Sequence, residues 1–174
     1  AELASTLPAR IKHLAFLVGR WRGVGKGSFP TISDFTYLEE AEFAPVPGGK
    51  PVLSYKQQTW RAGEEHARGP AMHSESGYVR IDGDGNPQFC VTHIVGLSEI
   101  CAGTVEGNKM SVASTSLTRC AGCKEPFVTK IAREFWIDGE DADCLRYCVY
   151  MATTRTPELT LHLEASLRRV EEKE

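Results

Sequence analysis

Near the N-terminus, apolar side chains recur three and four residues apart, which is the spacing of one helical face: Ile11, Leu14, Ala15 and Val18. We predict a helix over residues 5–18, with Ser5 or Thr6 as its N-cap and Pro8 in its first turn. The spacing ends at Gly19, so we expect the rest of the chain to take another form of secondary structure.

From Gly19 onward, apolar and polar residues alternate, as they do on strands with one buried face. Clusters of Gly, Pro, Asn and Asp separate the alternating runs and indicate tight turns. Beyond the glycine-rich run that begins at Gly19, the runs cover residues 35–43, 52–60, 72–81, 88–95, 109–116, 127–137, 144–153 and 159–170. Eight to ten strands joined by short turns predict antiparallel hairpins.

A sheet of that size tends to curl or split, and closing it into a barrel removes its exposed edges. We therefore predict an all-β fold, an antiparallel up-and-down β-barrel with a short N-terminal helix that plugs one end. A two-sheet sandwich is the alternative. A chain of 174 residues suits a single domain over 1–174. A barrel of this strand count can hold one ligand inside.

Three glycines at alternate positions, Gly23, Gly25 and Gly27, leave one face of the first strand without side chains. Another backbone or a flat ligand can approach that face closely, or the strand can bend sharply there. A phosphate loop is not expected, because no Gly-Lys-Ser/Thr sequence closes the run.

Composition and charge narrow the class of partner. The formal net charge is −3, which provides no basic surface for nucleic acid or anionic lipid. The apolar run at residues 14–18 is far shorter than a membrane span. Residues 1–10 lack the charged-then-apolar order of a secretory signal, so we expect a cytoplasmic location and no membrane partner.

The six cysteines include one CxxC pair, Cys120 and Cys123. Cys144 and Cys148 lie on a predicted strand, where residues four apart are separated by about 13 Å and cannot bind one metal ion together. We expect reduced cysteines, with a zinc or redox role for the CxxC pair as the alternative.

The histidines differ in their predicted surroundings. His93 alternates with apolar residues and is expected to face the interior, whereas His13 and His66 are expected to be solvated. Strict alternation would send Met72 and His73 to opposite faces unless a bulge intervenes.

His162 lies on the face opposite a row of leucines: Leu159, Leu161, Leu163 and Leu167. Periodicity alone therefore predicts a histidine at the rim or in solvent, unless a local bulge, or a strand face that turns inward near the mouth, brings it inside.

No serine lies in a Gly-x-Ser-x-Gly motif, and the pairs Glu39-Glu40 and Glu64-Glu65 have the pattern of surface charge. We therefore expect any chemistry to come from a cofactor. Arg133 shares a predicted face with apolar residues and could bind the carboxylate of a carried lipid.

The chain resembles the nitrobindins, haem-binding barrels that also form the C-terminal domain of a THAP-type zinc-finger protein. The resemblance begins with the GxWxGxG pattern of residues 19–25. It continues through Phe29-Pro30-Thr31-Ile32, Gly49-Lys50-Pro51-Val52, Met72-His73-Ser74-Glu75-Ser76-Gly77-Tyr78, Gly96-Leu97-Ser98-Glu99-Ile100 and His162-Leu163-Glu164-Ala165-Ser166-Leu167. It departs from the usual pattern at Ala71, where proline is common, and in the loop that carries the CxxC pair.

This resemblance implies a ten-stranded barrel akin to the fatty-acid-binding proteins, with haem b in ferric form near its open end. His162 is then the axial ligand of the iron. The other implied haem contacts are Thr31, Met72, His73, His93 and Met151. The implied activity is binding of nitric oxide and isomerisation of peroxynitrite to nitrate, with His162, His93 and His73 as the catalytic residues.

Two alternatives remain at this point: a nitric oxide sensor or carrier without turnover, and a barrel that binds an apolar small molecule. In each case the partners are small molecules, and we expect a monomer or a weak homodimer.

Overall fold

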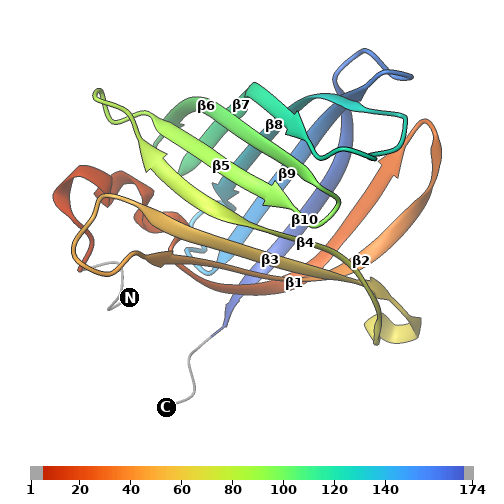
Figure 1. Cartoon of the computed structure of the whole chain (residues 1–174). Helices are drawn as coiled ribbons and strands as arrows, with labels where there is room; N and C mark the ends of the chain where they lie inside the picture. The colour runs from red at the N-terminus through yellow and green to blue at the C-terminus, as the bar shows by residue number, and fades with distance from the viewer. Residues whose placement is uncertain (1–5, 171–174) are drawn as a thin grey trace.

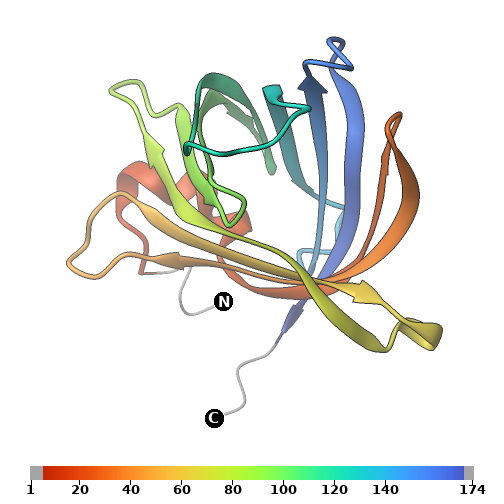
Figure 2. The same ribbon diagram turned by 45° about the vertical axis from the view of Figure 1, so that its right-hand side comes forward.

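Ten antiparallel strands close into a barrel in the computed structural model, which describes residues 6–170. The strands are β1 (Gly19–Phe29), β2 (Ile32–Pro45), β3 (Leu53–Ala62), β4 (Arg68–Ile81), β5 (Pro87–His93), β6 (Leu97–Glu106), β7 (Lys109–Arg119), β8 (Val128–Ile137), β9 (Cys144–Thr153) and β10 (Thr160–Val170). Each strand pairs with the next in sequence, and β10 returns to pair with β1 (Figures 1 and 2). The predicted up-and-down barrel is confirmed, and the sandwich alternative is wrong.

The alternation of the sequence identified every strand except β6. Its inward positions include Glu99, which is buried, so the apolar alternation is broken there. A carboxyl group inside the barrel was not expected, and for this reason the sequence pattern did not predict β6.

The N-terminal segment forms a 3-10 helix, η1 (Ala9–Leu17), so the predicted helix is shorter and more tightly wound. Three residues per turn align Ile11, Leu14 and Leu17 on one face, and all three are buried. Among the described residues no side-chain hydrogen bond caps the helix at Pro8, its N-cap position; the predicted cap Ser5 lies outside those residues.

The helix lies at one end of the barrel, as predicted (Figure 1). The Nε2 atom of His13 lies 2.9 Å from the Gly85 carbonyl oxygen in the β4–β5 turn. The Trp21 indole donates a 2.8 Å hydrogen bond to the Leu17 carbonyl and joins the helix to β1. This end is therefore filled by the core, and the opposite end is where a ligand can enter. A short second 3-10 helix, η2 (Glu64–His66), lies at the tip of the β3–β4 hairpin at that opposite end (Figure 2).

The bare glycine face of β1 is covered by aromatic rings of β2. A Cβ atom on Gly25 would overlap the Tyr37 ring, and one on Gly27 would overlap the Phe35 ring. The close approach predicted for this face is made by the protein's own side chains, which fixes Phe35 and Tyr37 along the barrel wall. Within residues 6–170, no helix has the length and apolar character needed to cross a membrane.

Candidate functional site

A cavity of about 270 Å³ occupies the barrel at the end opposite η1. Half of the residues that line it are apolar, among them Phe35, Met72, Val149, Met151 and Leu163. Polar groups line it as well: Tyr37, Tyr55, Gln57, Thr59, His73, Glu75, His93, Arg133, Tyr147 and His162. The structure thus brings together five of the six predicted haem contacts on this wall: His162, Met72, His73, His93 and Met151.

His162 faces this cavity because β10 contains a bulge. The pairing of β10 with β9 shifts register between Leu161 and Leu163, and both His162 and Leu163 line the cavity. The single leucine face predicted from periodicity is therefore wrong, since Leu159 and Leu161 lie outside while Leu167 is buried.

The His162 ring is oriented by its surroundings. Its Nδ1 lies 3.1 Å from the Ser28 carbonyl oxygen, which makes Nδ1 the donor. The Phe29 ring packs edge-on against it, with centroids 5.5 Å apart. Burial lowers the pKa of His162 although the Ser28 hydrogen bond opposes the shift, so the neutral ring is favoured. Nε2 has no hydrogen-bond partner among the described residues.

Met72 and His73 both reach the cavity, as a bulge was expected to allow. The β3–β4 pairing shifts register on both sides of Trp60, which pairs with Ala71. The His73 backbone N–H then donates to the Thr59 hydroxyl at 3.1 Å instead of joining a regular ladder. Because the pairing of β3 with β4 is irregular here, the adjacent side chains of Met72 and His73 both line the cavity.

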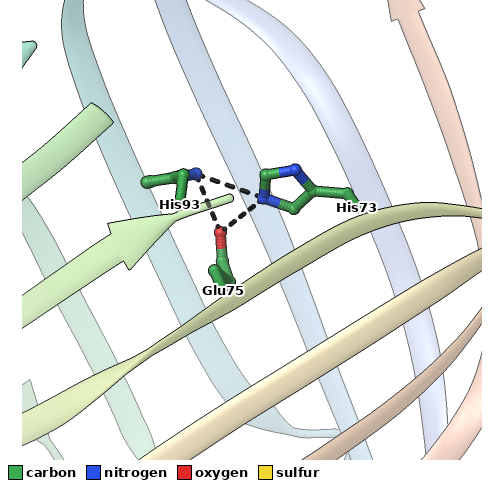
Figure 3. Close-up of side chains that lie close together, drawn as sticks. All are labelled: His73, Glu75 and His93. Carbon is green, nitrogen blue, oxygen red and sulfur yellow. Dashed lines mark hydrogen bonds and ion pairs between the residues drawn. The ribbon is translucent and has the colours of Figure 1, made fainter. Parts of the chain in front are cut away.

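His73, Glu75 and His93 form a compact cluster on the cavity wall (Figure 3). His73 Nε2 and His93 Nδ1 each lie 3.1 Å from Glu75 Oε2, and the two nitrogens lie 3.2 Å apart. The inward orientation predicted for His93 is confirmed. Glu75 is buried and was not identified from the sequence, since β4 also carries Ser74 and Ser76 and has no apolar alternation there.

Arg133 faces the interior as predicted, but its guanidinium is already paired. It lies 2.7 Å from Glu75 Oε1 and 2.5 Å from Glu99 Oε1, and all three side chains are buried. Burial opposes the charge on Glu75, yet Arg133 and the hydrogen bond from His73 hold the pKa of Glu75 well below its usual range. A lipid carboxylate would have to displace two buried carboxylates from Arg133, which argues against the lipid-carrier alternative.

Glu39 is not surface charge, which corrects the sequence prediction for it. It is buried and accepts a short hydrogen bond from the Tyr147 hydroxyl, whose oxygen lies 2.6 Å from that of Tyr37. Burial raises the pKa of Glu39 to about 8, so the carboxyl is protonated at neutral pH. Glu40 does lie at the surface, where it pairs with Arg22 and Arg68.

Two predicted features lie outside the cavity wall. Thr31 is exposed in the turn between β1 and β2, and its role as a haem contact stays a prediction. Cys120 and Cys123 are free thiols whose sulfur atoms both lie 3.5 Å from where a Cβ on Gly96 would stand. In the described part of the chain, no third His, Cys, Asp or Glu ligand joins them.

Comparison with known proteins places the chain in one family along nearly its whole length. The sequence profile of the THAP4-like, heme-binding beta-barrel domain matches residues 10–169. The chain is 39% identical to peroxynitrite isomerase 1 of Rhodococcus jostii, over 94% of this chain and 86% of that protein. It is 35% identical to peroxynitrite isomerase THAP4 of Bos taurus, covering 92% of this chain and 26% of that longer protein.

The solved structures include one with the same fold and a related sequence. The crystal structure of Rv2717c from M. tuberculosis superposes with a TM-score of 0.81 at 35% identity, covering 95% of this chain and 99% of that chain.

Proposed function

Because this chain belongs to the family of THAP4-like, heme-binding beta-barrel domains, we propose that it binds haem b through His162 and isomerises peroxynitrite to nitrate. The observation that carries the proposal is the His162 ring on the cavity wall, with Nδ1 bonded to the Ser28 carbonyl and Nε2 unpartnered. A neutral imidazole fixed in this way is one of the axial ligands that haem iron takes in proteins.

The surrounding residues suit a haem. Met72, Met151 and Phe35 offer an apolar wall for a macrocycle, and thioethers adapt to irregular surfaces. A bound ferric haem, held by His162, would supply an iron ion that binds nitric oxide and acts as a Lewis acid on the peroxynitrite anion.

Peroxynitrite and nitrate contain the same atoms, so the reaction consumes no outside reductant and releases no group. The chain must therefore hold the anion and keep its fragments together until they recombine. The apolar residues of the wall would limit the water in this space and so would favour recombination over escape.

His73 and His93 are the residues that we infer act on the anion. His73 contacts Glu75 through Nε2 at 3.1 Å and lines the cavity. Arg133 in turn fixes Glu75 through hydrogen bonds of 2.7 and 3.2 Å. A hydrogen bond to the anion from this cluster would stabilise the negative charge that shifts between its oxygens.

The first test is haem binding. Hemin is titrated into the wild-type chain, into His162→Ala and into His66→Asn, a matched change at an exposed histidine. We expect a Soret band for the wild type and His66→Asn, and at least about a tenfold weaker affinity for His162→Ala, equivalent to 1.4 kcal/mol. Equal affinity in all three proteins would contradict the assignment.

The second test separates turnover from binding alone. Stopped-flow absorbance follows peroxynitrite decay with hemin-loaded wild type, His93→Leu and His73→Leu, with hemin-free protein as the background. We expect faster decay and a higher nitrate yield with the wild type, reduced in both variants. If decay matches the background, the barrel binds nitric oxide as a sensor or carrier without turnover.

A further inference from the structure

We propose that His73 Nε2, His93 Nδ1 and Glu75 Oε2 form a binding site for a divalent transition-metal ion, separate from the haem ligand His162. The three atoms form a nearly equilateral triangle with sides of 3.1, 3.1 and 3.2 Å (Figure 3). They come from adjacent strands β4 and the end of β5, whose backbones are tied together by the Glu75–His93 pairing.

The triangle has the size that a metal ion needs. With metal–ligand bonds of about 2.1 Å, its sides subtend angles of about 95–100° at the ion, which is one face of an octahedron. Two histidines and one carboxylate on one face are the ligand set of non-haem iron sites and of open zinc sites. All three residues line the cavity, so the remaining positions on the ion would face it.

Glu75 is oriented for this role by groups that are not ligands. Its Oε1 accepts hydrogen bonds of 2.8 Å from the Tyr55 hydroxyl and 2.7 Å from Arg133. These bonds hold the carboxylate plane, so that Oε2 faces the two imidazoles while it also accepts a 3.2 Å hydrogen bond from Arg133 Nη2. Carboxylates that bind metal ions are commonly held in this way by hydrogen bonds from residues that do not contact the ion.

His93 has partners for both of its tautomers. Its Nε2 lies 3.5 Å from Arg133 Nη2, a donor, and 3.6 Å from Glu99 Oε1, an acceptor. Without metal, Nδ1–H can donate to Glu75 while Nε2 faces Arg133. With metal on Nδ1, the proton moves to Nε2 and faces Glu99, which gives the carboxylate–histidine–metal arrangement of known sites.

Glu99 is an independent sign of an incomplete site. Its side chain is 1% exposed, and both of its carboxyl oxygens lack a hydrogen-bond partner, although Oε1 is ion-paired with Arg133. A buried carboxyl oxygen without a donor is costly. Metal binding at Nδ1 of His93 would put the proton on Nε2, so that the ring would present a donor 3.6 Å from Glu99 Oε1.

The buried charges also favour a cation. Among residues 6–170, the buried ionisable carboxyls are Glu39, Glu75 and Glu99, whereas Arg133 is the single buried basic side chain. Even with Glu39 protonated, two carboxyls face one guanidinium. Imidazole ligands select zinc, iron, copper or nickel over magnesium and calcium, which prefer oxygen.

The test uses Zn²⁺ and the full chain without a histidine tag, after chelator treatment. Competition with a chelating dye gives stoichiometry and affinity for the wild type, His73→Ala, His93→Ala, and the control His66→Asn. We expect one Zn²⁺ per chain, the same affinity for the control, and affinity at least about tenfold weaker for each ligand variant. Excess Mg²⁺ is expected not to displace the ion.

His162→Ala distinguishes this site from the haem site. We expect it to retain Zn²⁺ while losing hemin affinity, so each proposal can fail without the other. Equal loss of Zn²⁺ in His162→Ala would assign the ion to His162 and overturn the triad, as would wild-type affinity in His73→Ala and His93→Ala.

A measurement on the wild type keeps the proposal falsifiable if a variant does not fold. Long-range ¹H–¹⁵N spectra report which nitrogen of each histidine carries the proton. Zn²⁺ should move the proton of His93 to Nε2 and leave His66 unchanged; unchanged His93 signals at saturating Zn²⁺ would refute the site.

Discussion

The Nδ1 atom of His162 lies 3.1 Å from the carbonyl oxygen of Ser28, across the junction of β10 and the end of β1. The two residues are 134 positions apart in the chain, and the barrel closure between β1 and β10 brings them together. The acceptor is a main-chain group, so its position depends on the strand and not on the Ser28 side chain. The same closure that completes the fold therefore selects which nitrogen of His162 is free.

This contact predicts the tautomer of His162 in the haem-free protein. Because Nδ1 donates to Ser28 and burial favours the neutral ring, Nε2 should carry a lone pair at pH 7. Long-range ¹H–¹⁵N spectra of labelled protein should give an unprotonated Nε2 signal. Exposed His66 serves as the reference for a solvated ring, and a protonated Nε2 in His162 would contradict the assignment.

Gly25→Ala should destabilise the barrel through Tyr37. The added Cβ would overlap the Tyr37 ring, which is buried and whose hydroxyl is bonded to that of Tyr147 at 2.6 Å. Overpacking of this kind costs about 1–3 kcal/mol. Urea unfolding measures the loss. Gly83→Ala is the control, since a Cβ there meets nothing within 4 Å; equal stability of the two variants would count against this packing.

Stability should fall with rising pH because of Glu39. Its pKa is raised to about 8 in the folded chain, so the folded state binds the extra proton between the unfolded value of about 4.5 and 8. The stabilisation from Glu39 is complete below about pH 4.5 and declines as the pH rises to about 8. Between pH 6 and 9, wild type should lose about 2–3 kcal/mol relative to Glu39→Gln.

Urea unfolding of both proteins at the two pH values checks this expectation. Taking the difference in unfolding free energy between the two proteins removes the contribution of every other titratable group, because both proteins contain those groups. A difference that does not change with pH would mean that Glu39 is ionised in the folded chain at pH 6.

Arg133→Met should destabilise the chain strongly. Removing the guanidinium leaves Glu75 and Glu99 buried without their cation, which costs about 3–5 kcal/mol. Arg80→Met is the matched change at an exposed position of β4 and should lie within about 0.5 kcal/mol of wild type. Thermal or urea unfolding compares them. Similar stabilities would indicate that the carboxyls become protonated at little cost.

The alternation of side chains and the turn residues were sufficient to predict an antiparallel barrel with a helix at one end. These features are local, since the period of two and the turn chemistry follow from the backbone. The absence of side chains on one face of β1 at Gly25 and Gly27 could also be predicted from the sequence. The rings that cover this face, those of Tyr37 and Phe35, come from the next strand. Without the motif sequence, however, periodicity would have left His162 at the rim.

The sequence by itself determined every strand but β6, the closed barrel as the favoured arrangement and the family resemblance, because these depend on residue spacing. Only the tertiary structure decided that the β10 bulge turns His162 inward and that Glu39, Glu75 and Glu99 are buried. A one-residue bulge reverses the face of every later side chain, and a carboxyl can be buried only where other strands supply its partners. Those partners, Tyr147 for Glu39 and Arg133 for Glu75 and Glu99, lie far away in the chain and meet only when the barrel closes.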